Sequence, residues 1–195
     1  AVAYWKNDEV RLIRDGKQTR PIPIGTLHGN RTMKTGDIVT IDIDRRRPQG
    51  PVPCVIKKGG SVIWEIDDLV GAGLPPDVDV HAFCNLDYEG EAARLSMEYV
   101  QDLALEPASA VVAAAARKQV PDVLWSTVSP CITVSDQGAV VTKTSETDGD
   151  FHSAIGPAVA PGSRAVFTFT WLNVSNSNLG FTTPELLQSL NKSPK

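Results

Sequence analysis

The chain has 195 residues and a net charge of −4, so it is long enough to bury a hydrophobic core of its own. Apolar residues make up 42% and charged residues 22% of the chain, a balance that excludes general disorder. The negative net charge argues against nucleic-acid binding over the whole surface. No apolar run reaches the roughly 20 residues needed to cross a bilayer, so we expect no membrane span.

Strand patterns recur along the first half at intervals of about ten residues. The clearest covers residues 38–44, where apolar and polar side chains alternate and therefore point to opposite faces. A longer strand is expected within 91–105, with Leu95 and Met97 on one face and Arg94 on the other. The remaining candidates in this half are 10–13, 53–56, 61–66 and 78–84.

The composition changes after Glu106-Pro107, which predicts a hinge because proline cannot donate to a sheet ladder. An alanine-rich helix is expected over 109–118, and a second short helix, with Pro184 at its first position, over 183–190. The strands expected between these helices are 123–128, 131–135, 138–144 and 164–172.

The last of these strands carries the strongest core pattern of the second half. Phe167, Phe169 and Trp171 alternate with polar or β-branched residues and therefore share one face. We expect this face to line a core with Leu124 and Val134.

These patterns predict an all-β fold, an antiparallel β-sandwich of the jelly-roll type with one or two short helices. The hinge divides it into a shell-like β-rich unit, 1–106, and a second β-rich unit, 107–195, which begins with the alanine-rich linker. The alternative is one continuous β-sandwich.

Paired aspartates are the most distinctive polar feature. The Asp-x-Asp pairs lie where strands meet loops: Asp42 with Asp44, Asp77 with Asp79, and Asp148 with Asp150. Calcium takes several oxygen ligands from neighbouring loops, so the first two pairs are candidate calcium ligands. No pair has EF-hand spacing, and the alternative is a solvated strand edge whose charges prevent aggregation.

The only basic run is Arg45-Arg46-Arg47. It is the candidate nucleic-acid contact, and the alternative is a solvated loop tip, because a run of this length is weak evidence for a phosphate site.

Three cysteines, Cys54, Cys84 and Cys131, are widely spaced and odd in number. Their spacing predicts neither a zinc site nor a disulfide framework, and we expect reduced thiols in a cytoplasmic or other intracellular setting. Residues 1–10 already carry charged side chains, which argues against a signal peptide.

No catalytic or nucleotide-binding motif is present, so we expect no enzyme. A hydrolase triad of His152 with a neighbouring serine and aspartate is a further hypothesis, but residues that are adjacent in sequence do not by that fact have the geometry of a triad. His81 lies within a predicted strand and is expected to be packed or hydrogen-bonded.

The hinge region resembles a known family. Met97-Glu98-Tyr99-Val100 followed by Leu105-Glu106-Pro107, together with 78–83, is similar to the end of the shell domain in coat proteins of small isometric, tombusvirus-type RNA plant viruses. The resemblance implies a virion protein that assembles with other copies of itself, bridges them with calcium and packages RNA. Because this sequence has no basic arm, the contact with RNA would run through a segment outside it.

Two functions therefore follow from the sequence, with the hydrolase as a third. The first is a structural, self-assembling viral coat protein. The second is a β-sandwich binding module for a protein or glycan ligand that uses tryptophan-bearing loops. Trp64 and Trp171 lie on strand patterns and are expected in the core, whereas Trp5 and Trp125 are candidates for ligand contact.

Overall fold

The computed structural model describes residues 2–6, 9–13, 25–47, 50–100, 125–127, 129–145, 152–175 and 177–183. These residues form fourteen β-strands, and none of them is helical. The all-β prediction is therefore confirmed. The alanine-rich helix, the Glu106-Pro107 hinge and all but the first residue of the second predicted helix lie outside the described residues.

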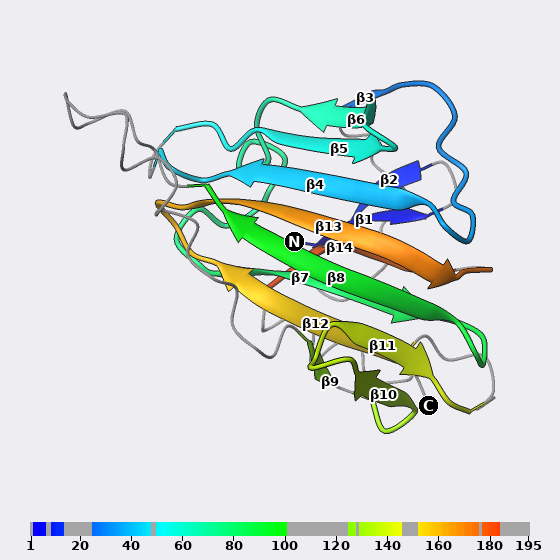
Figure 1. Cartoon of the computed structure of the whole chain (residues 1–195). Helices are drawn as coiled ribbons and strands as arrows, with labels where there is room; N and C mark the ends of the chain where they lie inside the picture. The colour runs from blue at the N-terminus through cyan, green and yellow to red at the C-terminus, as the bar shows by residue number, and fades with distance from the viewer. Residues whose placement is uncertain are drawn as a thin grey trace, which may run out of the picture.

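The strands form two antiparallel sheets (Figure 1). The six-stranded sheet has the order β2 (Glu9–Ile13), β1 (Val2–Lys6), β14 (Asn178–Thr182), β7 (Val80–Leu86), β12 (His152–Val159) and β9 (Ser126–Thr127). The eight-stranded sheet has the order β10 (Ile132–Ser135), β11 (Val140–Lys143), β8 (Ala92–Tyr99), β13 (Arg164–Asn173), β4 (Ile38–Asp44), β5 (Cys54–Lys58), β6 (Ser61–Ile66) and β3 (Thr26–Leu27).

Eight of these strands follow the jelly-roll order. Counted along the chain they are β1, β4, β7, β8, β11, β12, β13 and β14. The first, eighth, third and sixth lie side by side in one sheet, and the second, seventh, fourth and fifth in the other. Chain-distant strands thus alternate within each sheet, which is the pattern of two nested Greek keys.

Both halves of the chain contribute to both sheets. Strand β13 is hydrogen-bonded between β4 and β8, and β14 lies between β1 and β7. Strands from before and after residue 106 are therefore hydrogen-bonded to one another in both sheets. The long strand expected within 91–105, just before the predicted hinge, is β8, and it ends at Tyr99.

The core lies between the sheets, and β13 contributes four of its buried side chains. Phe167, Phe169 and Trp171 are fully buried, as predicted, and the ring of Phe167 meets that of Phe181 from the opposite sheet with centroids 6.1 Å apart. Val134 packs at the margin of this core, whereas Leu124 lies outside the described residues.

Tryptophans also belong to this core. Trp64 and Trp171 are buried, as predicted. The expectation that Trp125 contacts a ligand is wrong: it is 2% exposed, its indole ring packs against Phe169, and its Nε1 donates to the carbonyl of Ala139. The side chain of Trp5 is outside the described residues.

Candidate functional site

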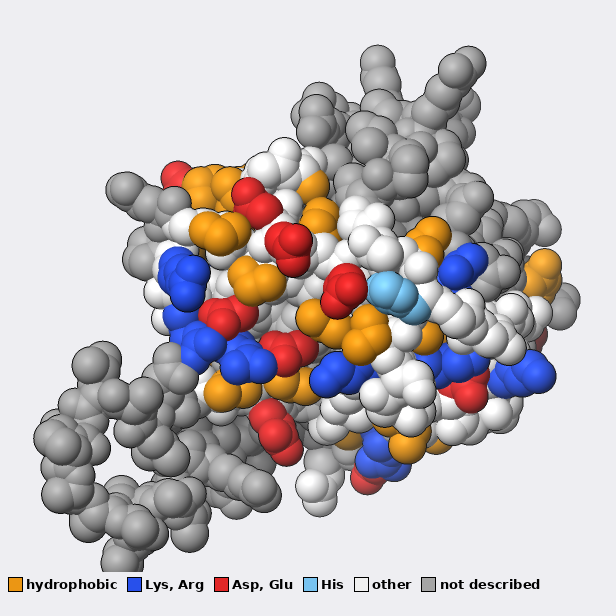
Figure 2. All heavy atoms as spheres, turned by 90° about the horizontal axis from the view of Figure 1, so that it is seen from above, with side chains coloured by type: hydrophobic (Ala, Val, Ile, Leu, Met, Phe, Trp, Pro, Cys, Tyr) orange, Lys and Arg blue, Asp and Glu red, His pale blue; other side chains and the backbone are white. Residues whose placement is uncertain are grey.

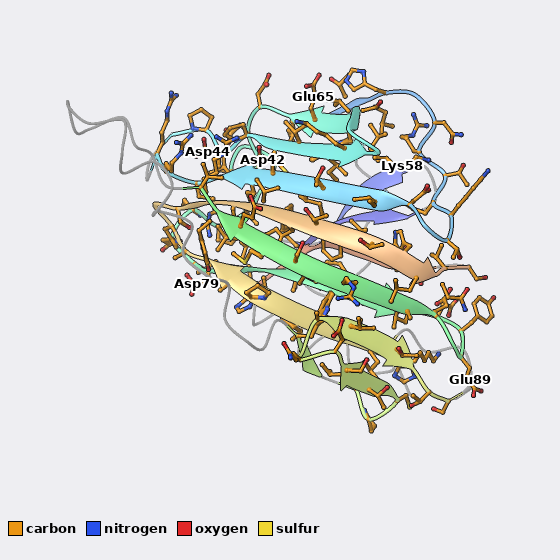
Figure 3. The ribbon with its side chains drawn as sticks, in the orientation of Figure 1. Asp42, Asp44, Lys58, Glu65, Asp79 and Glu89 are labelled. Carbon is orange, nitrogen blue, oxygen red and sulfur yellow. The ribbon has the colours of Figure 1, made fainter. Side chains whose placement is uncertain are left out.

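The candidate site residues gather at one end of the sandwich, where β4 and β8 finish and β7 begins; we call it the Arg45 end. Figure 3 shows Asp42 and Asp44 at the end of β4 and Asp79 further along the same end, near β12. The four predicted calcium ligands therefore come from two separate places: Asp42 and Asp44 from β4, and Asp77 and Asp79 from the loop before β7 of the other sheet.

The aspartates of β4 are each paired with an arginine. Asp42 accepts two hydrogen bonds from Arg164, of 2.9 and 2.7 Å, and this pairing raises the pKa of the guanidinium. Asp44 accepts from Nε and Nη2 of Arg46 at 2.8 and 2.5 Å, and these bonds hold the pKa of its carboxyl below the ordinary value. Both pairs are partly exposed, so they are ion pairs of the outer sheet face.

Arg45 is not part of this outer face. Its side chain is 2% exposed, and its guanidinium donates to the carbonyls of Val159 at 2.8 Å, Pro76 at 2.9 Å and Pro75 at 3.3 Å. Val159 belongs to β12, so the buried cation ties one sheet to the other. Burial lowers the pKa of Arg45, and the negative charges of Asp79 and Asp77 offset part of that effect.

The second aspartate pair faces solvent beside this buried arginine. Asp77 and Asp79 are exposed, and the charge of Asp79 adds to the burial that raises the pKa of Tyr99. The Tyr99 hydroxyl donates to the carbonyl of Ala158 at 2.7 Å, a second link between the sheets at this end. Among the described residues, no three His, Cys, Asp or Glu side chains come together as a metal site.

These contacts test whether calcium fits the predicted ligands. A calcium ion on Asp42 and Asp44 would have to replace Arg164 and Arg46 on the same oxygens. Within the described part of one copy, Asp42 and Asp44 therefore do not form the oxygen cage that calcium prefers.

A cleft opens between the end of β4 and the loop that follows it. Its volume is about 430 Å³, and it is lined by Asp44, Arg46, Arg47, Pro51, Pro53 and Asp67. The two proline rings are exposed apolar surfaces, and the lining carboxylates and guanidinium groups are equal in number. The cleft therefore suits an occupant with both an apolar part and polar groups.

The basic run is thus divided by the structure. Arg45 is buried and faces carbonyls, Arg46 is bound to Asp44, and Arg47 is exposed in the cleft. Figure 2 shows acidic, basic and apolar side chains interspersed over the face it presents. The structure therefore does not bring the three arginines together as a phosphate site.

The histidines are held by local hydrogen bonds. His81 Nδ1 lies 3.3 Å from the carbonyl of Gly156, as expected for a hydrogen-bonded strand residue. His152 Nδ1 is hydrogen-bonded to the hydroxyl of Ser129, a side chain that is 7% exposed. The neighbouring Ser153 instead donates to Asn85 at 2.5 Å, because consecutive strand residues point to opposite faces. Asp148 and Asp150 lie outside the described residues.

A buried carboxylate that was not predicted from the sequence lies at the opposite end, which we call the Glu91 end. Glu91 is 2% exposed and accepts hydrogen bonds from the backbone amides of Asp87 at 2.5 Å, Tyr88 at 3.0 Å and Ser175 at 2.7 Å. The ammonium group of Lys143, also buried, donates to the carbonyl of Asp87. No local pattern distinguishes Glu91 from a solvated glutamate, because one of the amides that it binds, that of Ser175, comes from a distant segment of the chain.

All three cysteines are free thiols, and burial raises the pKa of Cys54 and Cys84 well above the ordinary value. The described part of the chain contains no helix that is long and apolar enough to cross a membrane. A scan against protein-family models and a search of curated proteins find no match to this sequence.

Proposed function

We propose that the protein is a structural, self-assembling coat protein. The observation that carries the proposal is the strand order, in which chain-distant strands build two sheets of a jelly roll. Jelly rolls of this kind recur in viral capsid domains, and also in lectins and cupins. Fold alone does not fix function, so the resemblance of the hinge region supplies the second support.

Calcium and RNA are secondary parts of this proposal. Because Asp42 and Asp44 already carry arginines, calcium between subunits would be held by Asp77 and Asp79 together with oxygens of a neighbouring copy. Like charges at a subunit contact repel, and a bound cation or protonation relieves that repulsion. RNA would be contacted through a segment other than the arginine run.

Sedimentation velocity and electron microscopy of the purified chain near neutral pH test the proposal. Closed particles are the expected result, and a monomer at every concentration contradicts it. For the calcium part, chelation near neutral pH should swell or dissociate the particles, whereas chelation at about pH 5, nearer the carboxylate pKa values, should do much less. Asp77→Asn with Asp79→Asn should abolish the effect of the chelator.

The second candidate is a binding module for a protein or glycan ligand. The cleft of about 430 Å³ favours it, because its size falls in the range of ligand pockets. A glycan array and a protein pull-down, each repeated with Arg47→Ala, separate this function from the first. Binding that is lost in the variant, by a protein that stays monomeric, would favour the module.

A further inference from the structure

The turn between β7 and β8 presents an aromatic side chain to solvent on a backbone that is anchored by hydrogen bonds. Tyr88 is 54% exposed, and its neighbour Glu89 is exposed as well. The backbone of the turn that carries them is hydrogen-bonded to the carboxylate of Glu91 and the ammonium of Lys143. A partner that binds this turn, residues 87–90, therefore has little conformational entropy to remove, and aromatic side chains in that setting are typical interface anchors.

The cleft at the Arg45 end offers complementary groups. Pro51 and Pro53 supply apolar walls, and both are exposed. Asp44 and Arg46 are bound to each other, which leaves Arg47 and Asp67 as the lining charges for which the described residues provide no ion pair. The cleft is thus ready to accept one hydrogen-bond donor, one anion and a flat apolar ring.

We propose that the turn 87–90 of one copy docks into this cleft on a second copy. The ring of Tyr88 packs against the proline rings, and its hydroxyl donates to the carboxylate of Asp67. The carboxylate of Glu89 accepts from the guanidinium of Arg47, a pairing with matched fork geometry. The partner is a second copy of this chain because one molecule displays both halves of the contact.

The two halves lie at opposite ends of the molecule. Figure 3 shows Glu89 at the right end of the sandwich and Asp44 at the left end. A turn cannot reach the cleft of its own chain, and each copy uses its turn on one neighbour and its cleft on another. Such a head-to-tail contact builds a ring if the rotation closes and an open chain if it does not. The inference rests on the proposed self-assembly and names the surfaces that carry it.

Two variants break the contact from either side. Tyr88→Ala removes the anchor and Arg47→Glu reverses the charge in the cleft, and each should weaken association by at least about thirtyfold, the effect of an interface anchor. Leu172→Ala and Lys34→Glu are matched controls, because both side chains are exposed and lie outside the turn and the cleft. Both controls should associate as the wild type does.

Mixing the two variants gives the decisive measurement by sedimentation velocity. Each variant alone should be monomeric, while the equimolar mixture should form dimers and nothing larger, because the intact turn of Arg47→Glu meets the intact cleft of Tyr88→Ala. The double variant Glu89→Arg with Arg47→Glu should recover association. Circular dichroism of every variant checks that it is folded.

The outcomes separate this inference from the proposed function. Closed particles from both single variants would overturn the head-to-tail contact and leave the coat protein standing. Open chains of wild-type protein that the variants abolish would support the contact and count against a closed shell. A wild-type chain that is monomeric at every concentration would overturn both.

Discussion

The Arg45 end and the Glu91 end of the sandwich are both held by a buried charge, but the two charges have opposite signs. At the Arg45 end a guanidinium donates to three carbonyls, and one of these belongs to the other sheet. At the Glu91 end a carboxylate accepts from three backbone amides, two in a turn and one in the segment before β14.

Both contacts show how main-chain groups can satisfy a buried charged side chain. Each peptide group has a carbonyl that suits a cation and an amide that suits an anion, so a buried charge of either sign can find hydrogen-bond partners in the main chain. Arg45 uses carbonyls to join two layers, whereas Glu91 uses amides to shape a turn. The first contact serves the sandwich as a whole, and the second positions Tyr88.

A substitution in the middle of the sandwich provides the reference for both ends. Phe169→Ala should lower the free energy of unfolding by about 3–5 kcal/mol, because the side chain is fully buried and packs against Trp125. Urea unfolding measures the loss. A change below about 1 kcal/mol, the scale of a surface substitution, would contradict the packing between the sheets.

At the Arg45 end, Arg45→Met should cost about 3 kcal/mol, because it leaves the carbonyls of Val159, Pro75 and Pro76 without their donor in a buried place. Arg46→Met is the matched control one residue along the chain. It removes a partly exposed ion pair and should cost less than about 1 kcal/mol. Equal losses for the two variants would mean that the buried guanidinium does not join the sheets.

The sequence predicted much of the eight-stranded sheet because its central strands alternate cleanly. Strands β4 and β13 have inward apolar and outward polar side chains, and Arg94 on β8 points outward as expected. Strands β1, β3, β12 and β14 were not predicted. Gly156 and Pro157 interrupt the pattern of β12, and Gly180 interrupts that of β14. The bulge in β12 lies between Ile155 and Ala158 and accommodates Gly156 and Pro157.

The sequence predicted less of the candidate site. Asp44 and Arg46 were among the predicted site residues. The buried Arg45 could not be distinguished from Arg46 and Arg47, which are more exposed, because the three arginines look alike in a basic run. The cleft combines Arg46 and Arg47 with Asp67, which comes from a loop further along the chain. Such contacts follow from sheet topology, and local pattern does not contain them.

At the Glu91 end, Glu91→Gln should cost about 2 kcal/mol. The amide keeps the size of the side chain but places an NH₂ group against an amide donor, either that of Ser175 or those of the turn. Glu89→Gln, two residues earlier and exposed, should stay within about 0.5 kcal/mol of the wild type. Faster hydrogen exchange at Tyr88 in Glu91→Gln alone would locate the loss in the turn, and equal exchange in both variants would contradict it.

The smallest expected effect comes from Asp44→Asn, below about 1 kcal/mol near neutral pH, because its pair with Arg46 is partly exposed. The folded-state pKa of Asp44 is lowered, so its stabilisation is complete above the unfolded-state pKa of about 3.9 and is lost as the pH falls through the lower folded-state value. The difference in unfolding free energy between wild type and Asp44→Asn should therefore shrink below about pH 4.

The same titration separates the two neighbouring arginines. Arg45 is bound to carbonyls, which do not titrate, and the charges of Asp79 and Asp77 act on it only through space. The cost of Arg45→Met should therefore fall less than that of Arg46→Met as the pH falls from neutral to below about pH 4. The cost of Arg46→Met should fall together with that of Asp44→Asn, since both variants remove one ion pair. If all three costs fell in parallel, Arg45 would depend on a carboxylate, and the contrast between a cation held by carbonyls and one held by an aspartate would be wrong.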